Sequence, residues 1–420
     1  MKKILPISIM ILSALLQHSY AAEPEKGGDK KTEQSEFAKF IKGGKPIFNI
    51  RYLHESVNQK GIANQANANT VRTRIGYETA KFHDVSALVE FENVKRIGAE
   101  DYNDTINGRK NYPTVSDPND TNLNRLHVDY SGIKKTDVRL GRQTIILDNQ
   151  RFVGGIVWRQ NDQTMDAISV KTKLIKNSEI FYAHANRVNR VFGTRSKVGT
   201  WNDNNIDLIN ASYSFTPSLK AIGYSYLLDI PDNPALSSAT YGSKLDAKHK
   251  FNDQLSSALN FEYAYQRGYA SNPKNSVFNY FMAEPSLTYG QWTVRGQYES
   301  IGGNGTTAMQ FALGTNHAFN GWVDKFLTTP ANGLIDSNIG LEYVFKSDMN
   351  WINGAKTVVK HHKFRAENKN LIMDYGSETD FLFEKSFKNN FVIGVKAGKY
   401  KAKGLYTNTI KVMPYVSFKL

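Results

Sequence analysis

The 420-residue sequence contains no cysteine, and beyond its first residues it has no long apolar run. Without thiols the chain cannot form a disulfide framework, a thiolate metal site or the lipid-modified cysteine of a lipoprotein. A membrane-spanning helix needs ~20 consecutive apolar residues, and the strongly apolar run at 4–16 is shorter than that. We therefore expect no transmembrane helix in the mature chain, which excludes a protein of the inner membrane.

The short apolar run has the features of an export signal. Two lysines precede it, and the tripeptide SYA at 19–21 supplies small residues at the −3 and −1 positions. The pattern predicts a signal peptide at 1–21, with cleavage before Ala22. Residues 22–45 are charged and poor in hydrophobic residues, and they predict a flexible periplasmic segment with room for one short helix.

Removing the two lysines of the signal lowers the formal net charge from +14 to +12. A chain this basic would attract anionic lipid headgroups or an acidic solute. Nucleic acid is a poor candidate for an exported protein, so we expect no nucleic-acid partner.

From residue 46 onward the dominant period is two, the spacing of residues on one face of a β-strand. The same alternation appears at 70–79, 85–92 and 292–300. It is clearest at the end of the chain, where one face carries Ile410, Val412, Pro414, Val416, Phe418 and Leu420. A soluble edge strand could show this pattern once, but its recurrence indicates many strands with one apolar face each.

The alternation predicts eighteen strands. Their cores lie at 46–56, 70–79, 85–95, 123–132, 137–145, 167–175, 179–187, 206–215, 219–229, 240–250, 255–267, 278–289, 292–302, 334–345, 356–366, 375–386, 391–401 and 410–420. Short turns alternate with mostly longer connections, of which the longest are 96–122, 146–166, 188–205 and 303–333.

An even strand number, alternating connection lengths and apolar–polar alternation up to the last residue are typical of an outer-membrane barrel. Lipid cannot hydrogen-bond backbone groups, so a spanning sheet must close on itself. We therefore predict an all-β fold, a transmembrane antiparallel up-and-down β-barrel over 46–420, with short periplasmic turns and long external loops. About eighteen strands would leave an aqueous channel. A soluble β-sandwich or propeller is the alternative, but the aromatic residues on the apolar faces suit membrane girdles better.

Thirteen of the sixteen arginines lie in the first half of the chain. By alternation, the side chains that face the lumen on the early strands are Arg51, Arg72, Arg74, Arg125 and Arg139. Arg142 is out of phase with them, and Gly141 predicts a bulge that would re-aim it at the rim. Clustered guanidinium groups favour an anion-selective path. The alternative is that lumen arginines pair with acids such as Glu55 and Glu90 and stiffen the wall.

Catalysis has little support in the sequence. His317 and Asp324 share the loop at 303–333 and could serve a hydrolase at the rim, but no GxSxG motif or serine at a readable spacing accompanies them. His361 and His362 are adjacent on a strand and would point to opposite faces, so they are no metal pair. We predict no catalytic residue, no metal and no cofactor.

Three segments resemble the alginate-export family of outer-membrane barrels, especially its shorter, mostly uncharacterised members. They are GRQ at 141–143, DNQRFVGGIVWRQNDQTMDA at 148–167 and HAFNGWVDKFLTTPANGLID at 317–336. The segment 69–94 is similar to the opening hairpin of that family, and the likeness covers nearly all the mature chain. It implies an eighteen-stranded, monomeric pore with an arginine-rich lumen that passes an anionic polysaccharide outward.

The resemblance also implies site residues. The arginines that match its motifs are Arg142, Arg151 and Arg159, and their acidic neighbours would be Asp148, Asp162 and Asp166. Asp324 and Lys325, which follow His317, match the charged pair of the external-loop motif.

This chain is shorter than the dedicated exporters. The resemblance therefore supports an anion-conducting barrel, for carboxylate-bearing sugars, polysaccharide or small organic acids, more than alginate export itself. The partners expected are outer-membrane lipid and lipopolysaccharide, the anionic solute, and a barrel-assembly machinery that reads the C-terminal strand.

The segment 140–167 falls at the third external loop and mixes arginines, acids and hydrophobic residues. We expect it to fold inward and narrow the pore, with Phe152 and Trp158 as anchors and its charges facing the path. On this interpretation it is a selectivity element.

Overall fold

The computed structural model describes residues 38–368 and 373–420. The predicted signal peptide at 1–21 and most of the predicted segment at 22–45 lie outside the described residues. One helical turn at 38–42 precedes the first strand. Nowhere in the described ranges is there a helix of the length and apolar character needed to cross a membrane.

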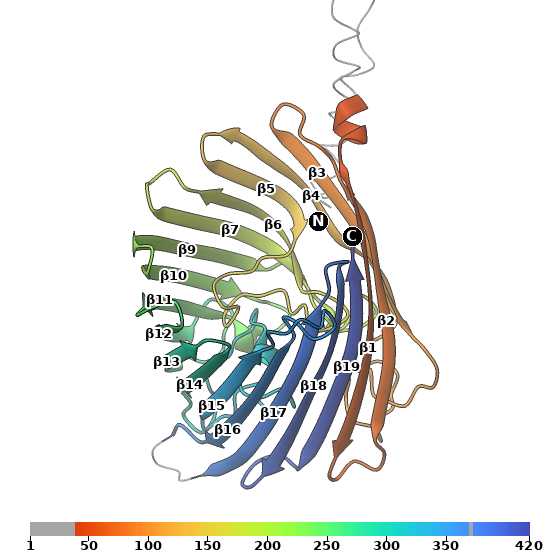
Figure 1. The fold of residues 1–420 in the computed structure, drawn as a ribbon, viewed down its shortest axis with the longest axis vertical. Helices are drawn as coiled ribbons and strands as arrows, with labels where there is room; N and C mark the ends of the chain where they lie inside the picture. The colour runs from red at the N-terminus through yellow and green to blue at the C-terminus, as the bar shows by residue number, and fades with distance from the viewer. Residues whose placement is uncertain (1–37, 369–372) are drawn as a thin grey trace, which may run out of the picture.

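The chain forms one antiparallel sheet that closes on itself (Figure 1). Its strands are β1 (Lys45–Gln59), β2 (Ala66–Glu78), β3 (Val85–Arg96), β4 (Asp120–Ile133), β5 (Thr136–Gln143), β6 (Thr164–Thr172), β7 (Ser178–Asn189), β8 (Thr200–Trp201), β9 (Asn205–Thr216), β10 (Leu219–Asp229), β11 (Ser238–Lys250), β12 (Leu255–Gly268), β13 (Val277–Tyr289), β14 (Trp292–Ile301), β15 (Leu334–Val344), β16 (Lys356–Arg365), β17 (Asp374–Ser386), β18 (Phe391–Ala402) and β19 (Thr409–Lys419). The two-residue β8 pairs with the end of β7 inside a loop, so eighteen strands of the described ranges form the wall.

The first and last strands close the barrel. Arg51 of β1 lies opposite Ser417 of β19 on one side and opposite Arg72 of β2 on the other. Closure gives every wall strand a partner on both edges, which is what a sheet needs in a medium that offers no hydrogen bonds. The predicted fold class, an antiparallel up-and-down barrel, is confirmed.

The outer face of the wall is apolar. On β19, Ile410 is 46% exposed and Val412 is 38% exposed, whereas the alternating residues Lys411 and Met413 are buried inside the barrel. The polar face therefore looks inward and the apolar face outward, as in a barrel that sits in lipid. This inversion explains how the chain can have a mean hydropathy of −0.47 and still span a membrane.

Connections of two to six residues lie at one end of the barrel, and connections of six to 32 residues lie at the other. The connection at 345–355 is a longer exception at the short-turn end. The third long loop differs from the prediction, because β5 ends at Gln143 and β6 begins at Thr164. Ile145 keeps the apolar alternation going but is buried against the barrel interior, after the chain has left the sheet.

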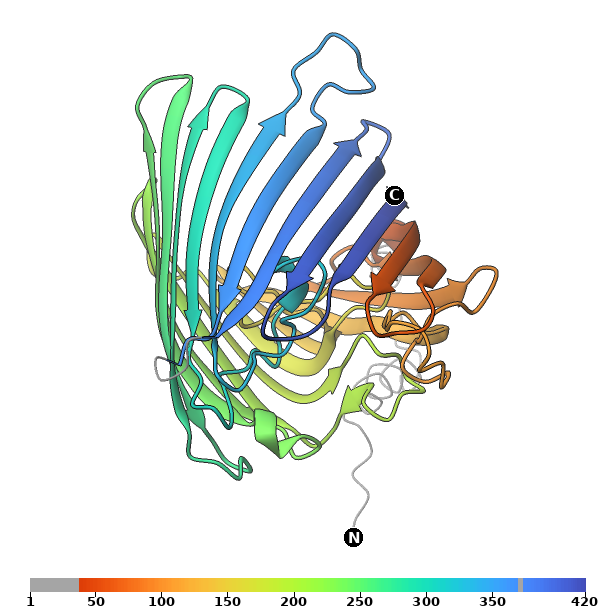
Figure 2. The same ribbon diagram turned by 90° about the horizontal axis from the view of Figure 1, so that it is seen from below.

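Two long connections, 144–163 (loop A) and 302–333 (loop B), turn into the barrel (Figures 1 and 2). They appear as the yellow and the teal-to-blue segments inside the ring of strands. Their apolar residues, including Val153, Phe311 and Leu313, join wall residues in one buried cluster. The barrel core is therefore built from loops, and we call loops A and B together the inner plug.

Candidate functional site: the waist of the barrel

Loops A and B are hydrogen-bonded to each other. Val153 and Leu313 form an isolated parallel β-bridge, and the Gly154 amide donates to the Leu313 carbonyl at 2.8 Å. The Gln163 side-chain amide donates to the Leu313 and Gly154 carbonyls, both at 2.9 Å. Because the two bonds to the Leu313 carbonyl join segments at least 150 residues apart, the two loops act as one unit across the lumen.

Phe152 seats loop A against the wall. Its ring lies 5.3 Å from Tyr224 of β10, 5.4 Å from Tyr280 of β13 and 5.1 Å from Phe311 of loop B, measured between ring centroids. Tilted and edge-on aromatic contacts of this kind add to the burial of apolar area. Phe152 thus lies where the sequence interpretation expected an anchor.

Arg151 ties both loops to β14. It is 1% exposed, and its Nε lies 2.9 Å from the Glu299 carboxylate. A second guanidinium nitrogen donates to the Asn320 side-chain oxygen on loop B at 2.9 Å, and the Phe311 ring centroid lies 3.7 Å from Cζ. The ion pair with β14 and the hydrogen bond to loop B together hold loop A in place.

Arg159 is the centre of a buried ionic network. Its NH1 lies 2.9 Å from Glu55 and 3.3 Å from Asp117, and its NH2 lies 3.3 Å from Asp324. Lys411 of β19 lies 3.0 Å from Glu55 and 2.6 Å from Asp324. Two cations and three carboxylates thus join loop A, loop B, the loop before β4, β1 and β19. Leaving a buried charge unpaired costs several kcal/mol, so this network opposes undocking.

The loop residues of this network have shifted pKa values. Burial opposes ionisation of Asp324, but His317 and Lys411 outweigh it and hold the pKa of that carboxyl well below its usual range. Burial lowers the pKa of His317 to about 4, despite the nearby Asp324. For Asp117, burial prevails over the attraction of Arg159 and raises the pKa. The docked plug therefore holds a neutral histidine beside an ionised Asp324.

A second cluster surrounds Trp158. The indole stacks on His317, with ring centroids 4.8 Å apart and 4° between the planes. The Lys396 ammonium lies 4.0 Å from the indole centroid and the Arg51 guanidinium carbon 4.9 Å from it. Arg51 also donates to the Trp158 carbonyl at 2.9 Å. Neither Arg51 nor Lys396 forms an ion pair with a carboxylate in the described part of the chain, and Lys396 is only half-buried.

Arg72 adds a third cation without a carboxylate partner among the described residues. It sits directly across from Arg51 in the sheet and donates from NH2 to the Asn49 side chain at 2.7 Å. Its Nε and NH1 and the indole Nε1 of Trp158 are buried and have no acceptor. Unused donors and unneutralised cations together favour an anion beside Trp158, at the level of the inner plug, which we call the waist.

The other predicted lumen arginines are neutralised. Arg74 lies 2.6 Å from Asp162 and 2.5 Å from Glu92. Arg125 pairs with Glu90 at 2.7 Å, and Arg139 pairs with Asp129 at 2.5 Å. These pairs correspond to the alternative in which lumen arginines stiffen the wall.

The position of Arg142 differs from the prediction, which placed a bulge at Gly141 and the arginine side chain at the rim of the pore. In the register it stands opposite Leu126 and Asp166, and Leu140 two residues earlier faces outward with 38% exposure. Gly141 has a positive φ of 124°, but the β5 pairings pass through it without a register shift. No bulge re-aims the side chain, so Arg142 stays on the outer face and pairs with Asp166 at 2.6 Å.

The remaining predicted site residues are dispersed. Asp148 accepts a hydrogen bond from Asn210 at 2.7 Å, and Lys325 donates to Gln59 at 3.2 Å. Of the three predicted acidic neighbours, Asp166 pairs with a motif arginine, whereas Asp148 and Asp162 contact the wall.

The histidine–aspartate pair belongs to the plug. His317 Nδ1 lies 2.6 Å from Asp324, and its Nε2 lies 3.5 Å from the Lys396 ammonium rather than near a hydroxyl. In the described part of the chain no cluster of His, Asp and Glu is arranged to hold a metal ion. His362 is buried against Asp336 at 2.9 Å, while His361 is exposed on the other face of β16.

Lys396 and Lys411 were missed by the sequence interpretation, which concentrated on arginines. Alternation alone would have found them, because Lys411 lies on the inward face opposite Ile410 and Val412 and Lys396 lies on the inward face of β18. Below the plug, a hollow of about 680 Å³ continues towards the short-turn end and is lined by Lys171, Lys220 and several acids.

Residues 65–299, more than half of the chain, match the model of the alginate export family. The chain belongs to that family. A comparison with curated proteins gives no sequence match.

Several solved structures share the fold of this alginate-export-family protein. OccAB4 of Acinetobacter baumannii aligns with a TM-score of 0.69 at 15% identity, over 90% of this chain and 98% of the other. OccAB2 of the same organism aligns with 0.70 at 16%, over 91% and 99%. OpdK of Pseudomonas aeruginosa, crystallised with vanillate, aligns with 0.71 at 12%, over 91% and 99%. At these identities the likeness shows the barrel fold alone.

Proposed function

We propose that this protein is a passive outer-membrane channel for small anionic solutes, above all carboxylates. The observation that carries the proposal is the surplus of positive charge beside Trp158: Arg51 and Lys396 contact the indole, Arg72 lies across the sheet from Arg51, and none of the three has a carboxylate partner in the described structure. The other predicted lumen arginines are neutralised by carboxylates, so a passing anion would gain the most electrostatic stabilisation at this cluster.

The geometry suggests how such a solute would be selected. A carboxylate entering the waist loses part of its hydration, and guanidinium and ammonium donors replace the lost hydrogen bonds. Lys396 is the half-buried member of the cluster, so it would meet the solute first. Arg51 and Arg72 would supply a fixed positive field behind it. Below, Lys171 and Lys220 line the hollow that leads to the short-turn end.

The plug favours small solutes over a polymer. Loops A and B are joined across the lumen and locked by buried ion pairs. A lumen wide enough for a polymer chain would therefore require the loops to undock. OpdK, which shares the fold, was crystallised with vanillate, a small aromatic carboxylate. Family membership keeps uronate sugars and polysaccharide as the alternative cargo. We also propose that the chain is exported through the signal at 1–21. It would act as a monomer, because one chain closes the barrel.

The test is current block in planar bilayers. Benzoate, galacturonate and short oligouronates would be added to single channels of the wild type and of the double variant R51Q/K396Q. We expect the small carboxylates to block the wild type in a concentration-dependent way and the double variant at least tenfold more weakly. The matched control is R139Q, which removes a lumen charge that is already paired. Equal block of all three proteins would contradict the site. Block by the oligouronates alone would favour the polymer alternative.

A further inference from the structure

The outward face of β18 changes character near its loop end. The outward residues Phe391, Ile393 and Val395 are apolar, and the next outward charged residues are Lys399 and Lys401. Outward apolar residues mark the lipid-facing band of a barrel, which is ~25 Å tall, and charged residues follow where the headgroups begin. The lysines therefore mark the level of the external headgroups.

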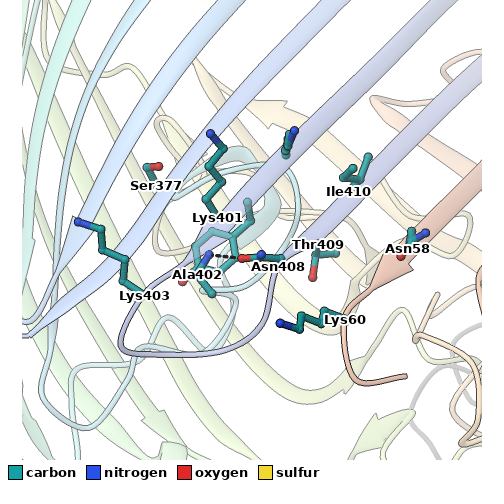
Figure 3. Close-up of a pocket in the computed structure, with 11 residues that line it drawn as sticks. Asn58, Lys60, Ser377, Lys401, Ala402, Lys403, Asn408, Thr409 and Ile410 are labelled. Carbon is teal, nitrogen blue, oxygen red and sulfur yellow. Dashed lines mark hydrogen bonds between the residues drawn. The ribbon is translucent and has the colours of Figure 1, made fainter. Parts of the chain in front are cut away.

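A groove of about 720 Å³ lies at this level on the outside of the barrel (Figure 3). Lys401 at the end of β18, Lys403 just after that strand and Lys60 just after β1 line the groove (Figure 3). Asn408, on the loop between β18 and β19, lies between them and accepts a hydrogen bond from the Ala402 amide at 2.8 Å. That bond fixes the loop that forms one side of the groove.

The positive charge of the groove is largely unneutralised. Lys403 pairs with Asp374 at 2.9 Å. Lys60, Lys399 and Lys401 form no ion pair with any carboxylate of the described ranges, and all three are exposed. Three exposed lysines without an ion-pair partner therefore line one groove at the edge of the membrane-facing wall.

The same level carries basic residues on the neighbouring strands. Lys401 stands opposite Ser377 of β17, which in turn stands opposite Lys363 of β16. Strands are ~4.8 Å apart, so Lys363 and Lys401 are separated by ~10 Å along this row. Two phosphates on one sugar headgroup could bridge such a spacing.

We propose that this groove binds the phosphorylated sugar headgroup of the outer-leaflet glycolipid, lipopolysaccharide. Lysine binds phosphate as a compact point charge with three donors, and Lys60, Lys399 and Lys401 provide three such groups. The acyl chains of the same molecule would lie along the apolar band beneath, over Val395 and Val412. Inorganic phosphate has no acyl chains and would make no contact with that apolar band. The proposal is independent of the channel function.

The variant K60Q/K399Q/K401Q tests it. The control K134Q/K346Q/K388Q removes the same charge from exposed lysines in the turns at the opposite end. Each purified, delipidated protein would be titrated in detergent with bisphosphorylated lipid A, with dephosphorylated lipid A and with inorganic phosphate, and binding read by native mass spectrometry. Heat-dependent gel mobility would confirm folding, and the single variant K401Q replaces the triple one if folding fails.

We expect the groove variant to bind bisphosphorylated lipid A at least tenfold more weakly than the wild type and the control, because each lysine near an anionic headgroup contributes ~1 kcal/mol and three are removed. Dephosphorylated lipid A should not distinguish the proteins. Equal binding of bisphosphorylated lipid A by all three would overturn the proposal. Displacement of lipid A by millimolar inorganic phosphate would overturn it in favour of a free-anion site.

Discussion

Replacing Arg159 with methionine should release the inner plug. The substitution keeps the aliphatic stem but removes the charge that meets Glu55, Asp117 and Asp324 at 2.9 to 3.3 Å. Three buried carboxylates are then left with one cation, Lys411. Removing one partner of a buried ion pair typically costs ~3–5 kcal/mol. At 1.4 kcal/mol per tenfold change, the equilibrium between docked and undocked plug should shift about a hundredfold or more.

Single-channel recording in planar bilayers measures this shift. We expect the Arg159→Met channel to open to larger, noisier current levels than the wild type, because an undocked plug leaves a wider lumen. The control is Arg139→Met. Its pair with Asp129 is about 40% exposed on the arginine side, and such pairs contribute at most ~1 kcal/mol. A second change, Asp117→Asn in the Arg159→Met background, should partly restore the wild-type levels, because it removes a carboxylate that burial already disfavours. Quiet, wild-type conductance in Arg159→Met would refute the ionic lock.

Three further outcomes follow from the same geometry. Acidification from pH 7 to pH 5 should loosen the plug by roughly 2 kcal/mol, because His317 has a pKa of about 4 when docked and an ordinary value of 6.5 when released, so protons favour the released loop. A looser plug should increase the gating noise at pH 5, and this increase should vanish in His317→Gln. A His317→Gln channel with the pH dependence of the wild type would exclude the histidine as the group that titrates. Phe152→Ala should cost ~3–5 kcal/mol of packing and make loop A sensitive to protease in intact barrels; resistance equal to the wild type would show that the aromatic seat is dispensable. Arg142→Ala should leave ion selectivity unaltered, since its side chain lies on the outer face, and any change in reversal potential would contradict that placement.

The wall of this barrel could be predicted from the sequence because its cause is local. Lipid on one side and water on the other impose a period of two on each strand, and that period is readable within ten residues. Even Lys411, which belongs to no motif, could be placed on the inward face from its apolar neighbours on β19. The strand ends were harder to predict, as at Ile145, where burial by the plug continues the apolar pattern after the sheet has ended.

The contacts of the inward loop could not be predicted from sequence. Arg159 meets Glu55 across 104 residues and Asp324 across 165 residues of chain, and no spacing rule links such positions. Arg142 was misplaced for a different reason. A glycine with positive φ often accompanies a bulge, but Gly141 has a positive φ within a strand whose register is not shifted at that residue.

The reversal potential of the wild-type channel tests the central claim most directly. Under a tenfold KCl gradient, the cations around Trp158 should make chloride more permeant than potassium, and substituting R51Q/K396Q should move the reversal potential towards zero. A wild-type channel that prefers potassium, or a double variant with the wild-type reversal potential, would contradict the assignment of the waist as an anion site.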